Sequence, residues 1–140
     1  METDVVQFIV PGGPVGKARP RMTRSGHAYT PEKTVSYENL VKMRFIEKYP
    51  DWVPVAGEAK IKLIAYYPIP KSASKRKRIE MDIGTIRPTK KPDVDNIMKA
   101  IADALNGIAY VDDSQIVTAE VRKYYSATPR VEVEIDFRGE

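Results

Sequence analysis

Two spacings of apolar side chains alternate along the chain and predict both strands and helices. A period of two indicates a half-buried strand, and apolar positions three and four residues apart indicate a helix with one buried face. Residues 130–137 alternate strictly, whereas residues 5–10 are apolar on both faces, which is typical of an interior strand. Strands are therefore predicted over residues 5–10, 58–67, 115–125 and 130–137.

Helices are predicted over residues 31–48, about 74–82 and 93–106. The last has the clearest apolar arc, formed by Val94, Ile97, Met98, Ile101, Ala104 and Leu105. Gly107 follows this helix where a left-handed C-cap is expected. Residues 15–30 are expected to be irregular, because Pro20 and Gly26 oppose regular structure.

The order of these elements predicts an α+β fold. We expect a single domain over residues 1–140, with a mixed β-sheet of about four strands and helices packed on one face. The chain has no cysteine, so neither a disulfide framework nor a thiol zinc site is expected. The apolar run at residues 5–10 is too short for a signal peptide or a membrane span, so a cytoplasmic protein without a membrane partner is expected.

Positive charge is concentrated in two segments, although the whole chain has a net charge of only +4. Residues 71–91 hold eight Lys or Arg against two acids, and residues 11–24 hold four without an acid. Charged runs are often only solvated faces, but two together favour a phosphate-binding surface. The predicted DNA-binding residues are Lys17, Arg19, Arg21, Lys75, Arg76, Arg78, Arg87, Lys90 and Lys91.

Carboxylates stand at both ends of the predicted helix over residues 93–106. Asp93 and Asp95 at its start could simply cap the helix and complement its dipole. Lys99 lies one turn beyond Asp95, and Asp112 and Asp113 follow the helix where no cap requires them. If the fold brings these groups together, oxygen ligands without His or Cys suit Mg²⁺, for which Mn²⁺ can substitute, and such an ion activates water against a phosphodiester.

The run KPDVDNIMKAIADALNGIAYVDDSQI, residues 91–116, resembles the RusA family of Holliday-junction resolvases. The resemblance extends more loosely to residues 16–21 and 70–72. It implies a homodimeric, Mg²⁺-dependent endonuclease that nicks opposed strands of a four-way DNA junction in recombination and repair. It also implies that Asp93, Asp95 and Asp113 bind the metal and that Lys99 is the essential lysine. Some members have a basic residue where this chain has Pro92.

Three other polar residues are candidates to support these groups: Asp112, Asn96 and Asp103. Asp103 stands two turns from Asp95, about 12 Å along a helix, which is too far to bind the same ion. Asp112 could be a ligand, a supporting residue or merely exposed. Two other functions stay open, a nuclease of flaps or forks that uses the same acids and a non-catalytic DNA-binding recombination accessory protein.

Overall fold

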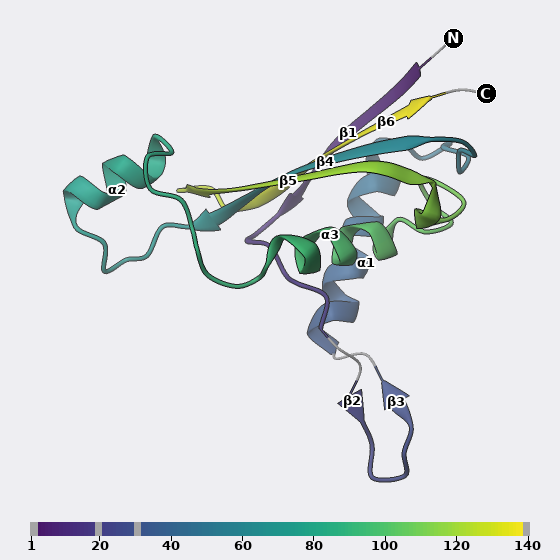
Figure 1. Ribbon diagram of the computed structural model, residues 1–140, viewed down its shortest axis with the longest axis horizontal. Helices are drawn as coiled ribbons and strands as arrows, with labels where there is room; N and C mark the ends of the chain where they lie inside the picture. The colour runs from purple at the N-terminus through teal and green to yellow at the C-terminus, as the bar shows by residue number, and fades with distance from the viewer. Residues whose placement is uncertain (1–2, 19–20, 30–31, 139–140) are drawn as a thin grey trace.

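A four-stranded mixed sheet forms the body of the protein in its computed structural model, which describes residues 3–18, 21–29 and 32–138 (Figure 1). Its strands are β1 (Thr3–Pro11), β4 (Ala59–Pro68), β5 (Ile116–Ser126) and β6 (Arg130–Arg138), in the order β1-β6-β4-β5. Only the β4–β5 pair is parallel among these neighbours. The predicted α+β class, with a mixed sheet of four strands, is confirmed.

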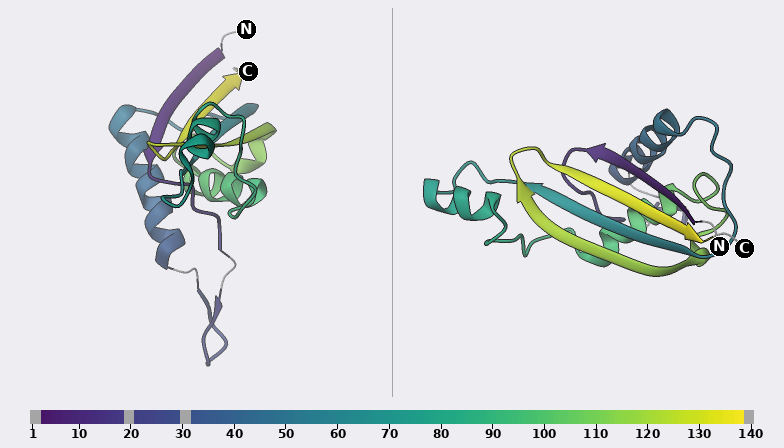
Figure 2. Two further views of the ribbon diagram at one scale, coloured as in Figure 1. Left: turned by 90° about the vertical axis from the view of Figure 1, so that its left-hand side faces the viewer. Right: turned by 90° about the horizontal axis from the view of Figure 1, so that it is seen from above.

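Two helices cover one face of this sheet, α1 (Glu32–Lys48) and α3 (Val94–Ala104) (Figure 2). The core lies between them and the inward side chains of the strands, with Phe45 of α1, Ile101 of α3 and Leu63 of β4 almost fully buried. The third helix, α2 (Lys75–Asp82), stands beyond the end of the sheet, and the Ser74 hydroxyl caps its first turn. None of the helices in the described ranges is long and apolar enough to cross a membrane.

The first strand is not interior, so that prediction was wrong. β1 lies at an edge of the sheet and pairs only with β6. Its side chains alternate, with Val6, Phe8 and Val10 buried, while Val5 and Ile9 are 51% and 53% exposed. In the described part of the chain, one face of the sheet has no helix over it (Figure 2). Apolar residues on both sides of a strand therefore did not require a central position.

A β-hairpin stands within the segment that was expected to be irregular. β2 (Arg21–Met22) pairs with β3 (Ala28–Tyr29), and Gly26 has a φ of +85° in the turn between them. The Thr23 hydroxyl accepts a hydrogen bond from the backbone N–H of His27, which closes the turn. Gly26 therefore makes the hairpin possible, because a positive φ in a turn favours glycine.

Candidate active site

The start of α3 leaves one carboxylate without a capping role. Asp93 is the N-cap residue of α3 by its backbone conformation, yet its side chain makes no capping hydrogen bond. Asp95 follows in the first turn, and both residues are exposed. The capping explanation for Asp93 therefore fails, and two neighbouring carboxylates face solvent at a helix N-terminus.

Contacts from two distant segments hold the turn that carries Asp93. The hydroxyl of Tyr67 on β4 donates to the carbonyl of Pro92 at 2.6 Å. From the other side, Gly16 packs so closely that an added Cβ would lie 2.8 Å from the Cβ of Pro92. The backbone N–H of Lys17 donates to the carbonyl of Asn96 at 3.0 Å. Burial, with the nearby charge of Asp93, raises the pKa of Tyr67 to about 12.

Asp112 caps a short helix, so the expectation that no cap requires it was wrong, while its part in the metal site stays a prediction. It precedes the short 3₁₀ helix η1 (Asp113–Gln115), and its carboxylate accepts the backbone N–H of Ser114 at 3.1 Å. The side chain of Gln115 accepts in return from the backbone N–H of Asp112. The hydrogen bonds from Ser114 lower the pKa of Asp112.

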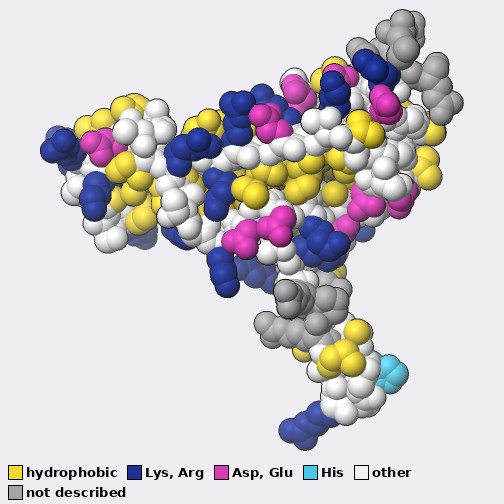
Figure 3. Space-filling model, in the orientation of Figure 1, with side chains coloured by type: hydrophobic (Ala, Val, Ile, Leu, Met, Phe, Trp, Pro, Cys, Tyr) yellow, Lys and Arg dark blue, Asp and Glu magenta, His cyan; other side chains and the backbone are white. Residues whose placement is uncertain are grey.

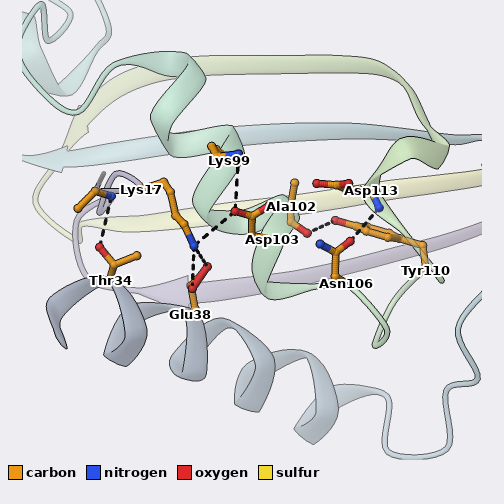
Figure 4. A network of polar contacts seen from close by, with 10 residues as sticks. Lys17, Thr34, Glu38, Lys99, Ala102, Asp103, Asn106, Tyr110 and Asp113 are labelled. Carbon is orange, nitrogen blue, oxygen red and sulfur yellow. Dashed lines mark hydrogen bonds and ion pairs between the residues drawn. The ribbon is translucent and has the colours of Figure 1, made fainter. Parts of the chain in front are cut away.

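Asp113 lies at the opposite end of α3 from Asp93 and Asp95. Its backbone N–H donates to the side-chain oxygen of Asn106, just after the helix ends, at 2.8 Å (Figure 4). Burial raises the pKa of the neighbouring Tyr110, and the charge of Asp113 adds to that shift. Tyr110 itself is fixed, because its hydroxyl donates to the carbonyl of Ala102.

The three proposed metal ligands therefore do not meet within one chain. An 11-residue helix is about 16 Å long, whereas Mg²⁺ binds its ligands at about 2.1 Å. Within residues 3–18, 21–29 and 32–138, no group of three Asp, Glu, His or Cys residues is close enough to hold a metal ion. The convergence of the acids from both ends of this helix, on which the predicted metal site depended, is therefore not found within one chain among the described residues.

A network of charges lies along the second half of α3 (Figure 4). Asp103 is 4.0 Å from the ammonium of Lys99, which is itself 63% exposed. Asp103 also lies 3.4 Å from the ammonium of Lys17, which is 3.0 Å from a carboxylate oxygen of Glu38 on α1. Burial alone would lower the pKa of Lys17, but the hydrogen bond and charge of Glu38, with Asp103, raise it. Asp103 thus connects Lys99 to the body of the protein.

A protein family and two known proteins are similar to this chain, over different parts of its length. Residues 11–136 match the family model described as Endodeoxyribonuclease RusA. The chain belongs to the RusA endodeoxyribonuclease family. It is 41% identical over 137 residues to "Uncharacterized protein YqaN" of Bacillus subtilis (strain 168), covering 94% of this chain and 96% of that protein. A second relative, "Crossover junction endodeoxyribonuclease rusA" of Lactococcus phage r1t, is 44% identical over 48 residues, or 34% of this chain and 37% of that protein.

Membership in the RusA family confirms the enzyme class that residues 91–116 predicted. The protein is an endodeoxyribonuclease, of a family of Holliday-junction resolvases. The roles of Asp93, Asp95, Asp113 and Lys99 stay predictions, because the match covers their positions without testing them. The geometry adds that Asp93 and Asp95 stand together, while Asp113 stands apart from both.

The predicted DNA-binding residues of this RusA-family chain fall into different surroundings. Lys75, Arg76 and Arg78 lie on α2, the projecting helix, which has basic side chains on its surface (Figure 3). Arg87, Lys90 and Lys91 lie on the segment that leads back to α3. Arg78 donates to the carbonyls of Ala73 and Lys71, so it braces its own loop. Lys17 is only 18% exposed and is paired with acids. Arg19 and the side chain of Arg21 lie outside the described residues.

Gly16→Ala is expected to slow DNA cleavage at least tenfold, because the new methyl group would displace Pro92 and with it Asp93. Such crowding costs about 1–3 kcal/mol of stability, which thermal unfolding will report separately from the cleavage rate. Gly13→Ala is the matched control, since its Cβ would lie 3.4 Å from Pro68, an ordinary contact. Equal cleavage rates in the two variants would mean that the Gly16 contact does not position the turn.

Proposed function

We propose that the protein resolves Holliday junctions by paired nicks in DNA recombination and repair, and that it depends on Mg²⁺, with Mn²⁺ able to substitute. The family match and the name of the phage relative support a four-way junction as substrate. The observation that carries the metal-dependent chemistry is the Asp93 carboxylate, which is exposed beside Asp95 and has no capping hydrogen bond.

The donor set fits a small hard cation. Asp93, Asp95 and Asp113 offer only carboxylate oxygens, and Mg²⁺ takes few such ligands together with water and substrate phosphate. When bound, the ion supplies an activated water and neutralises charge on the phosphodiester. Lys99 then stabilises the charge that develops on the phosphate, and Asp103 restrains the ammonium of Lys99 at 4.0 Å.

The separation of Asp113 from Asp93 supports a homodimer as the active form. A two-fold axis across α3 would bring Asp113 of a second copy to Asp95, and the same operation would create an equivalent site at the other end. A groove of about 250 Å³ beside Asp95 is lined by Val94, Met98, Ala119 and Val121. This apolar surface, with Val94 48% exposed, suits burial against a second copy. A dimer with two sites also matches a junction in which two strands are cut.

Labelled four-way junctions provide the test. With Mg²⁺ the protein is expected to give paired, symmetrical nicks in opposed strands, and EDTA is expected to abolish them. Ca²⁺ should permit binding with little cleavage, because it is larger and more flexibly ligated. Cutting at a single arm, or preference for flaps or forks, would favour the other nuclease function. Binding without cutting under any metal would indicate an accessory protein.

A cytoplasmic location stays the expectation for an enzyme whose substrate is DNA. It follows from the substrate class rather than from any feature of the fold. Fractionation of cells that express the tagged protein would test it directly.

A further inference from the structure

Cationic side chains lie over the rings of four tyrosines at the ends of β4 and β5, and one of these cations, Arg130 over Tyr66, is paired with Glu132. Tyr66 and Tyr67 of β4 are paired in register with Tyr124 and Tyr125 of β5. Because neighbouring residues on a strand point to opposite faces, Tyr67 and Tyr125 share the helix-covered face with Lys123. The ammonium of Lys123 lies 5.0 Å from the Tyr67 ring centre, that of Lys90 5.7 Å from Tyr125, and the guanidinium of Arg87 4.3 Å from Tyr124.

The same cations hold the segment between α2 and α3 against the edge of the sheet. The side chain of Arg87 donates to the carbonyl of Lys123 at 2.9 Å, and the ammonium of Lys123 donates to the carbonyl of Lys90 at 2.7 Å. Gly84 lies against Tyr124, where a Cβ would be 3.7 Å from the ring. Residues 84–91 are therefore fixed along β5, and they lead directly from the basic helix to Asp93.

Within the described part of the chain, these three cations differ from Lys17 and Arg122 in having no acidic partner. Lys17 is paired with Glu38 and Asp103, and Arg122 lies 3.0 Å from Glu120. No ion pair is found for Arg87, Lys90 or Lys123 among the residues that the structure describes. A tyrosine ring attracts and orients a cation but leaves its net charge in place. The result is three ordered positive charges without compensation.

We propose that Arg87, Lys90 and Lys123 form a cation–tyrosine shelf that binds the phosphates of the DNA strand running from α2 to Asp93. The inference rests on the proposed function and deepens it, since it adds Lys123 as a phosphate-binding residue. The shelf is continuous with the active site, because the ring that carries Lys123 belongs to Tyr67, whose hydroxyl holds Pro92. The positive charge of these three side chains, which no acid neutralises among the described residues, favours binding to DNA phosphate.

Salt dependence of junction binding in Ca²⁺ tests the shelf. Each lost phosphate contact reduces the steepness of the plot of log binding constant against log salt concentration by about 0.9. If the binding constants of the variant and the unaltered protein are equal at about 1 M salt, the variant binds about eightfold more weakly at about 0.1 M. Lys123→Gln and Lys90→Ala are each expected to show this loss, and the double variant a loss of about 60-fold. Lys123→Arg should retain the slope because it keeps the charge.

Arg122→Gln is the matched control, since it removes a neighbouring cation of β5 that is already paired with Glu120. It is expected to bind like the unaltered protein. Lys90 is exposed, so Lys90→Ala remains informative if Lys123→Gln unfolds, which circular dichroism will detect. An unchanged slope in folded Lys90→Ala and in folded Lys123→Gln would overturn the shelf.

The experiment separates the shelf from the proposed function. If the unaltered protein cuts junctions and the variants keep its salt slope, the shelf is wrong and the function stands. If it binds duplex and junction equally while the variants lose slope on both, the shelf stands and junction resolution is wrong. Failure of the unaltered protein to bind any DNA would reject both.

Discussion

Asp95→Asn is expected to lower DNA cleavage by about a thousandfold or more while leaving junction affinity within about threefold. The amide keeps the size of the side chain but removes the negative charge that would hold a hard cation. Without the charge stabilisation by the metal, the activation free energy of cleavage rises by several kcal/mol. DNA binding depends instead on the basic segments, so it survives the change. Single-turnover cleavage and gel-shift affinity on the same labelled junction measure the two effects.

Asp51→Asn is the control for this variant, because it removes an exposed carboxylate from the turn after α1, away from α3. Its cleavage rate should match that of the unaltered protein. Equal cleavage by Asp95→Asn and the unaltered protein would remove Asp95 from the metal site. Loss of binding together with cleavage would instead indicate a structural role at the start of α3.

The parts of the fold that could be predicted from sequence are those fixed by local patterns. Strict alternation in β6 and the apolar arc of α3 depend on neighbouring residues only, and both elements form where they were expected. The edge position of β1 depends on pairing with β6, more than a hundred residues later. No local pattern contains that information, so the apolar character of β1 was misinterpreted as a central position.

The same distinction applies to the candidate site. Asp93 and Asp95 are brought together by the helix that contains them, whereas the position of Asp113 depends on how the chain returns after α3. The sequence did contain a signal for Asp112, since an acid followed three residues later by Gln115 is the pattern of a capping box. Lys123 had no such signal, because its contacts with Tyr67 and Lys90 join separate segments.

Mixing two inactive variants is expected to restore cleavage if the metal site lies between two copies. In a dimer of one Asp95→Asn chain and one Asp113→Asn chain, one site loses both changed acids and the other keeps Asp93, Asp95 and Asp113 intact. Half of the dimers in an equal mixture are mixed, so about a quarter of all sites should be whole, and about half of the sites once mixed dimers are purified. Each mixed dimer can cut only one strand, so single nicks without paired resolution are expected on the labelled junction.

A mixture of Asp93→Asn and Asp95→Asn is the matched control, because both changes affect the same end of α3 and no mixed dimer keeps a complete site. It should stay inactive. Chains with different affinity tags, coexpressed and purified through both tags, ensure that only mixed dimers are assayed. No recovery in verified Asp95→Asn and Asp113→Asn dimers would mean that the acids do not combine across two copies. Since these acids form no metal site within one chain among the described residues, that result would also remove Asp113 as a ligand of the same ion.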